Sequence, residues 1–197
     1  MRYVWGGFPQ GRVTLIEGGP GAGKTLIALQ SLVHGAQLGE AGIFVAFEET
    51  PARIVANVAS FNWGLPALQQ KRLFFLDARP PTDVMQSGDF DLGGMLAALD
   101  AKIKTMRAKR IVFDAIDVIL ALMNDLSTER HELYRLQNWI AARGLTAVIT
   151  SKRSGAGLGR ERADFLEFMS GLRGAVGPYR DQRRLSAQLA RTQVPRL

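Results

Sequence analysis

Gly18-Gly19-Pro20-Gly21-Ala22-Gly23-Lys24-Thr25 is the stretch that decides the fold, because it fits the pattern G-x-x-x-x-G-K-[ST] of a phosphate-binding loop. It stands between an apolar run of strand length and a helical pattern that begins near Lys24, which is the context this motif requires. Glycines let the backbone turn its N–H groups inward, toward an anion that also faces the positive end of the following helix. The sequence therefore predicts that ATP contacts Gly19, Pro20, Gly21, Ala22, Gly23, Lys24, Thr25 and Leu26.

Within this loop, two side chains have separate expected tasks. Lys24 is expected to bind the β- and γ-phosphates of ATP, and the Thr25 hydroxyl is expected to ligate Mg²⁺.

The regions outward from the loop alternate between strand and helix patterns. Strand-length apolar runs occupy residues 13–16, 42–47, 73–76, 111–113 and 146–150, and most of them are apolar on both faces. Such runs are typical of a parallel sheet covered by helices on each side. Apolar residues at three- and four-residue spacing predict helices over residues 25–36, 51–61, 92–107 and 127–143. The pattern predicts one doubly wound α/β domain of the kind found in P-loop NTPases.

The overall composition excludes several classes of protein. A chain of 197 residues with 47% hydrophobic and 22% charged residues is typical of a globular domain with one core. The absence of cysteine excludes disulfides, a thiolate nucleophile and cysteine metal sites. No apolar stretch approaches the roughly 20 residues of a membrane span, and no signal peptide pattern opens the chain, so we expect a cytoplasmic protein.

Two acidic segments follow predicted strands and complete the expected site. Asp114 ends an apolar run, which would bring its carboxylate to the carboxyl edge of the sheet, where Mg²⁺ is expected. The alternative for Asp114 is a cap on the next segment. Glu48 and Glu49 end another run, where a carboxylate suits a base that activates water. Their alternative is the N-terminal cap of the helix after Pro51.

Five short segments stand in an order that identifies a family. They are Gly6-Gly7-Phe8-Pro9-Gln10-Gly11, EGGPGAGKT at residues 17–25, Phe47-Glu48-Glu49-Thr50-Pro51, Ser60-Phe61-Asn62-Trp63 and Val112-Phe113-Asp114. With them the chain resembles the KaiC-like branch of the RecA-type P-loop ATPases over residues 6–170. The resemblance implies a RecA-like domain that binds Mg-ATP and hydrolyses it slowly. It also implies a homo-oligomeric ring, usually a hexamer, that acts on a protein client in timing or signalling.

The resemblance also implies roles for particular residues. Glu48 and Glu49 become the catalytic pair that activates water, and Ser60 stands where the family contacts nucleotide. Thr150 and Ser151 resemble the family's γ-phosphate sensors.

The final segment of the chain departs from the family pattern. Residues 1–151 carry 15 Lys and Arg against 14 Asp and Glu, whereas residues 152–197 carry 10 against 4. The family ends this domain with a strand pair and a Lys-x-Arg-Gly segment, whose cations act on the neighbouring subunit's nucleotide, and this sequence has no such segment. We therefore divide the chain into an ATPase domain at residues 1–170 and an aberrant basic tail at residues 171–197, and we expect weakened turnover.

A frameshift near Gly171 is our hypothesis for this tail. Read one base out of frame, residues 171–178 can encode Asp-Cys-Ala-Val-Leu-Leu-Asp-His, and residues 192–196 can encode Leu-Lys-Tyr-Arg-Gly. Both strings resemble the missing strands, and the coding DNA tests the idea directly. Loss of these strands would leave an apolar strand edge around residues 146–150 and would remove the ring contacts.

Two further functions stay open at this stage. RecA-type folds include recombination ATPases that bind single-stranded DNA, and residues 151–162 are rich in glycine with four cations against one acid. They contain no aromatic residue on which a base could stack, which favours a solvated loop over a nucleic-acid site. The third function is a module that binds ATP for assembly without hydrolysing it.

Overall fold

Six parallel strands form a single sheet at the centre of the molecule. The computed structural model describes residues 8–81, 90–123 and 125–152, together with the backbone of residues 173–176. The strands are β1 (Val13–Gly18), β2 (Gly42–Ala46), β3 (Leu73–Asp77), β4 (Arg110–Asp114), β5 (Thr146–Lys152) and β6 (Arg173–Val176). Their order is β3-β2-β4-β5-β1-β6, and every neighbouring pair is parallel. The predicted α/β fold is confirmed.

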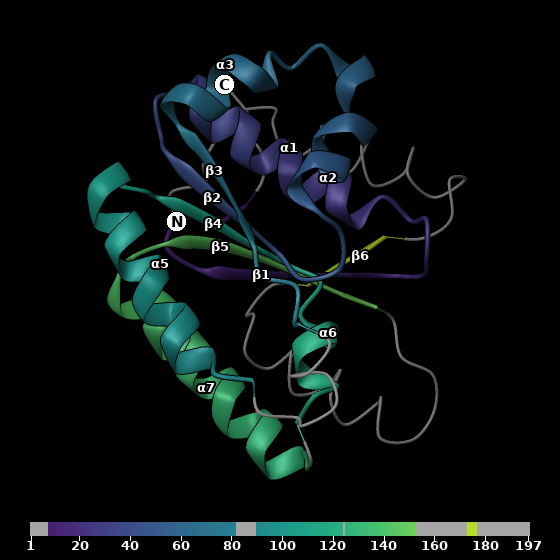
Figure 1. The fold of residues 1–197 in the computed structure, drawn as a ribbon, viewed down its shortest axis with the longest axis vertical. Coiled ribbons are helices and arrows are strands. Elements are labelled where there is room, and N and C mark those ends of the chain that lie inside the picture. Colours follow the sequence, from purple (N-terminus) through teal and green to yellow (C-terminus); the bar gives the residue numbers. More distant parts are fainter. Residues whose placement is uncertain (1–7, 82–89, 124, 153–172, 177–197) are drawn as a thin grey trace, which may run out of the picture.

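Helices cover both faces of this sheet (Figure 1). One face carries α1 (Lys24–Gln37), α2 (Pro51–Asn57), the 3-10 helix η1 (Ala59–Phe61) and α3 (Leu65–Lys71). The other face carries α5 (Leu92–Met106), α6 (Asp117–Leu120) and α7 (Leu126–Ala142). Among the described residues, no helix is both long and apolar enough to cross a membrane.

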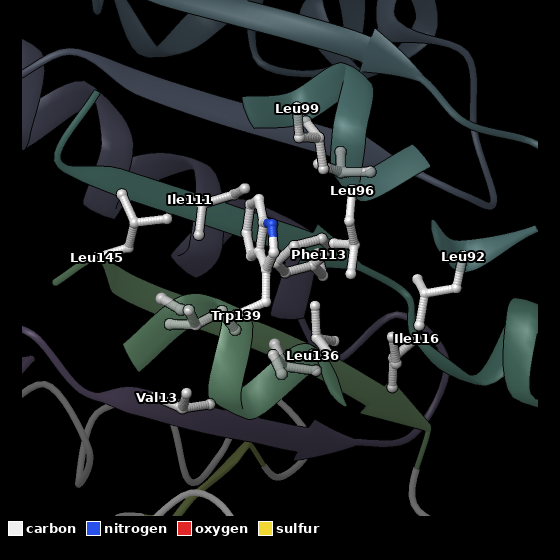
Figure 2. Packing of buried hydrophobic residues seen from close by; sticks show 14 of the residues in the cluster. Val13, Leu92, Leu96, Leu99, Ile111, Phe113, Ile116, Leu136, Trp139 and Leu145 are labelled. Atoms are coloured by element: carbon white, nitrogen blue, oxygen red, sulfur yellow. The ribbon is translucent and has the colours of Figure 1, made fainter. Parts of the chain in front are cut away.

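The alternation of side chains along each strand explains why the runs are apolar on both faces. Neighbouring residues of a strand point to opposite faces. Ile111 and Phe113 of β4 pack against α5, α6 and α7, whereas Val112 between them packs in the cluster beneath α1. Figure 2 shows the first cluster, in which the Trp139 ring of α7 lies among Ile111, Phe113 and Leu96. The inner strands β1, β2 and β4 thus have two buried faces and no solvent face, whereas the edge strand β3 is mostly half-buried.

A buried arginine fixes α1 against β4. Arg110 is 4% exposed, its Nε lies 2.6 Å from Oε2 of Glu40, and its Nη1 donates to the Ser31 carbonyl at 2.9 Å. Gly35 makes this close approach possible, because a Cβ there would lie 2.4 Å from the Arg110 Nε. The helix that begins at Lys24 is therefore held firmly beside the central strands.

The structure corrects several details of the expected fold. The predicted helix over residues 51–61 is divided into α2 and η1, which ends at Asn62 in the left-handed conformation (φ 53°). The short helices α3 and α6 have no counterpart in the predicted elements, since neither is long enough to show helical periodicity. The expectation of an exposed edge at residues 146–150 is wrong, because β5 lies between β4 and β1.

A short strand occupies the beginning of the tail. The four residues of β6 pair with β1 from Leu15↔Arg173 to Gly18↔Val176. The sequence lacks an apolar run here, so the strand was not expected, and its backbone ladder now covers the outer edge of β1. The rest of the tail, residues 171–172 and 177–197, lies outside the described residues, and so does the proposed boundary at residue 170.

An ion pair between α5 and α7 makes the first prediction. Nε and Nη2 of Arg143 donate to the two carboxylate oxygens of Asp100, and the Arg143 guanidinium lies 4.4 Å above the centre of the Trp139 ring. The hydrogen bonds from Arg143 lower the pKa of Asp100 below its ordinary value of 3.8. Because both side chains are less than a third exposed, Asp100→Asn should lower the free energy of unfolding by about 1 kcal/mol at pH 7.

This stabilisation has a definite pH dependence. A carboxylate whose pKa is lowered by folding stabilises the folded state above its unfolded pKa, and the effect disappears as the pH falls through the folded value. Urea unfolding at several pH values should show the difference between the parent chain and Asp100→Asn shrinking as the pH falls below about 3.8 and vanishing below the lower pKa of the folded state. Arg143→Met should show the same pH-dependent loss in addition to the loss of its contacts with Trp139, and the double variant should lose no more than Arg143→Met alone. A difference that stays constant with pH would contradict the ion pair.

Candidate functional site

The phosphate loop joins the carboxyl end of β1 to the first turn of α1. Gly21 (φ 69°) and Gly23 (φ 85°) adopt left-handed backbone conformations that glycine takes without strain. Gly23 is also the N-cap of α1 and provides no side-chain cap, so the N–H groups of the first turn are left for another acceptor. Nζ of Lys24 donates to the carbonyls of Gly18 at 2.9 Å and Gly19 at 3.0 Å. Two backbone carbonyls of the loop segment therefore hold the ammonium of Lys24.

Asp114 is the centre of a hydrogen-bonded group that joins three elements. It ends β4 and is 6% exposed. Its Oδ2 accepts a hydrogen bond from Oγ1 of Thr25 at 2.9 Å, and its Oδ1 accepts one from Oγ1 of Thr150 on β5. Three of the residues predicted for the site are thus brought together at the carboxyl edge of the sheet.

Burial raises the pKa of the Asp114 carboxyl group. The hydrogen bonds from Thr150 and Thr25 act in the opposite direction, and the negative charge of Glu48 adds to the effect of burial. A positive ion at this carboxylate would offset the cost of its desolvation.

The donor atoms around Asp114 fit Mg²⁺. A hydroxyl and a carboxylate oxygen lie 2.9 Å apart, and Mg²⁺ prefers oxygen ligands, of which proteins usually supply only one or two beside substrate phosphates. Among the described residues there is no group of three or more His, Asp or Glu that could hold a metal without a ligand's help. This donor set suits an ion that arrives with a phosphate.

Glu48 follows β2, and its carboxylate pairs with a lysine from another strand. Nζ of Lys152, the last residue of β5, lies 2.8 Å from Oε1 of Glu48. Since β4 separates β2 from β5, this ion pair passes over the end of β4, where Asp114 stands. Both side chains are close to half exposed. The hydrogen bond to Glu48 raises the pKa of Lys152.

Glu49 has different surroundings from Glu48. Its Oε2 accepts a hydrogen bond from Nδ2 of Asn57 at 3.2 Å and lies 3.5 Å from Nε of Arg53, both on α2. The N-cap of α2 is Thr50, whose Oγ1 accepts a hydrogen bond from the Arg53 N–H at 3.2 Å. The capping alternative for the two glutamates therefore belongs to Thr50, and Glu49 is engaged with the side chains of α2.

The other predicted site residues lie in several environments. Leu26 is half-buried in the first turn of α1, and Ala22 is buried in the loop. Ser60 is exposed on η1. Ser151 is buried and donates from Oγ to Oδ1 of Asp117 at 2.8 Å, so it does not join the group around Asp114. Of the glycine-rich loop at residues 151–162, only the first two residues are described.

Lys152 and Asp117 are two residues at the site that sequence reasoning missed. Asp117 accepts hydrogen bonds from Ser151 Oγ and from the Lys152 backbone N–H at 2.6 Å, which fixes the end of β5 to α6. The signal for Lys152 was its position two residues after Thr150, because side chains two apart in a strand share a face. Without the strand order, nothing in the sequence connects Lys152 to Glu48.

Comparisons with known proteins show which sequences this chain resembles. The family model described as "ATPase: KaiC" matches residues 2–172. The circadian clock oscillator protein KaiC of Thermostichus vulcanus is 40% identical over 151 residues, which cover 75% of this chain and 29% of that protein. The circadian clock protein KaiC2 of Synechocystis sp. is 39% identical over 159 residues, covering 79% of this chain and 28% of the relative. The chain thus spans less than a third of the length of these relatives.

Proposed function

The chain belongs to the KaiC family of ATPases, and from this premise we propose that it binds Mg-ATP at residues 18–25 and hydrolyses it slowly. The observation that carries the proposal is the hydrogen-bonded group of Thr25, Asp114 and Thr150 beside an open helix N-terminus. A P-loop NTPase needs these parts next to one another, and they come from three different elements.

In this proposal, residues of the phosphate loop bind the phosphates of ATP. The β- and γ-phosphates are bound by the uncapped N–H groups of α1 and by the ammonium of Lys24. To reach the phosphates, this ammonium gives up its hydrogen bonds to the carbonyls of Gly18 and Gly19. Thr25 and Asp114 hold Mg²⁺, which neutralises charge on the phosphate oxygens when bound. Thr150 keeps the Asp114 carboxylate oriented through its hydrogen bond.

Glu48 is our proposed base. Its carboxylate stands at the carboxyl edge of the sheet and is close to half exposed, so a water molecule can reach it. It orients that water and accepts its proton. Glu49 has a secondary role, which is supported by its contacts with Asn57 and Arg53 of α2.

The finer features of this function follow the family. We propose that the chain acts as a timing or signalling ATPase whose ring assembly and turnover are weakened because its sequence lacks the family's Lys-x-Arg-Gly cations. Arginine fingers that act between subunits contribute factors of about 10³ to 10⁵ in rate. Their absence lowers turnover and leaves nucleotide binding intact.

Steady-state Mg-ATP turnover by the purified chain, with nucleotide affinity measured alongside, tests this proposal. We expect micromolar or tighter ATP binding and a slow turnover that requires Mg²⁺. Binding without turnover would favour a module that uses ATP for assembly alone. Absence of binding would overturn the proposed function.

A further inference from the structure

Lys152 has two neighbours of opposite kinds, and they suggest a second task for its ammonium group. On one side it pairs with Glu48, the proposed base, at 2.8 Å. On the other side its backbone is paired in register with Gly18, the first glycine of the phosphate loop. Neighbouring strands lie about 4.8 Å apart, so the backbone of Lys152 lies next to the loop. Its side chain extends from there to the carboxylate of the proposed base, Glu48.

The side chain of Lys152 lies on the same face of the sheet as the loop. Val148 of β5 packs in the cluster beneath α1, and Thr150 two residues later contacts Asp114, which contacts Thr25. Alternation puts Lys152 on this face as well. Hydrogen bonds to Asp117 hold the backbone of Lys152 in place. The Lys152 N–H donates to the Asp117 carboxylate at 2.6 Å, and the side chain of Ser151 donates to the same carboxylate.

The strengths of the two possible contacts decide where the ammonium goes. An ion pair between side chains that are close to half exposed is weak, since water competes for both charges. A phosphate group carries more negative charge than one carboxylate and has several acceptor oxygens, so its contact with a cation is stronger. A terminal phosphate on the loop would therefore draw Lys152 away from Glu48.

Resting on the proposed function above, we propose that Lys152 is a γ-phosphate ligand that exchanges partners: it binds Glu48 in the absence of ATP and binds the terminal phosphate when ATP is present. The exchange frees the Glu48 carboxylate only when there is a phosphate to attack. Thr150 and Ser151, which the resemblance suggested as sensors, donate hydrogen bonds to Asp114 and Asp117, and Lys152 follows them at the end of β5. ADP has no terminal γ-phosphate and leaves the ion pair in place.

The test compares the affinities of two probes, Mg-ADP and the Mg complex of the β,γ-imido analogue of ATP. Lys152→Met should weaken binding of the analogue by at least about tenfold and change ADP affinity by less than about twofold. Lys152→Arg should keep most of the analogue affinity. Lys71→Met removes the same charge from an exposed position at the end of α3, before β3 begins, and should change neither affinity.

A second set of variants distinguishes exchange from a simple surface contact. Glu48→Gln should strengthen analogue binding severalfold in the parent chain, because Lys152 no longer leaves a partner, and should have no such effect in the Lys152→Met background. An equal effect of Lys152→Met on both nucleotides, or no effect on the analogue, would overturn the inference while the proposed function stands. If the parent chain bound neither probe, both would be overturned.

Discussion

Lys24→Ala should abolish measurable Mg-ATP binding and leave the domain folded. Without the ammonium, the phosphates lose their charge-assisted contacts in the loop, and we expect an affinity loss of at least about a hundredfold. Among the described residues, this ammonium donates to the carbonyls of Gly18 and Gly19, in a loop whose two residues after β1 are exposed. Stability should therefore change by less than about 1 kcal/mol.

Isothermal titration with Mg-ATP, next to a thermal unfolding scan of the same samples, measures both quantities. Lys71→Ala is the matched control, since Lys71 is exposed at the end of α3. ATP binding that survives Lys24→Ala, with the fold intact, would mean that the nucleotide site lies elsewhere.

Glu48→Gln should reduce turnover by at least about a hundredfold and leave ATP affinity no weaker than in the parent chain. A positioned base contributes factors of about 10² to 10⁴ in rate, and an amide of the same shape cannot accept the proton. The half-exposed position of the side chain means that the fold should tolerate the change.

Glu49→Gln provides the matched control for this prediction. Since Glu49 contacts Asn57 and Arg53 of α2, its loss should reduce turnover by less than about tenfold. The measurement is phosphate release at saturating Mg-ATP for both variants. A larger loss with Glu49→Gln than with Glu48→Gln would assign the base to the other glutamate.

The layers of the fold could be predicted from the sequence because each strand is apolar on both faces. Runs such as Ile111-Val112-Phe113 read as covered parallel strands, and the structure confirms them as β4 between two helical layers. The loop motif likewise placed Lys24 at the beginning of a helix, where α1 begins. Both inferences use neighbouring residues only, which is where sequence patterns carry information.

What could not be predicted depends on contacts between distant segments. The ion pair of Lys152 with Glu48 requires the strand order, in which β4 separates β2 from β5, and local patterns do not determine that order. The strand at residues 173–176 forms by backbone pairing with β1. Its sequence, Arg-Gly-Ala-Val, contains no apolar run from which a strand could be predicted.

The position of β1 inside the sheet has a consequence for biosynthesis. Among the strands that the structure describes, β1 is translated first, yet its partners in the sheet are β5 and β6, which are translated last. At about 5 to 20 residues per second, the ribosome leaves β1 without a partner for on the order of ten seconds. During that interval the strand that leads into the phosphate loop lacks both of its sheet partners. The proposed nucleotide site lacks Thr150 and Lys152 throughout this interval, because both residues belong to β5.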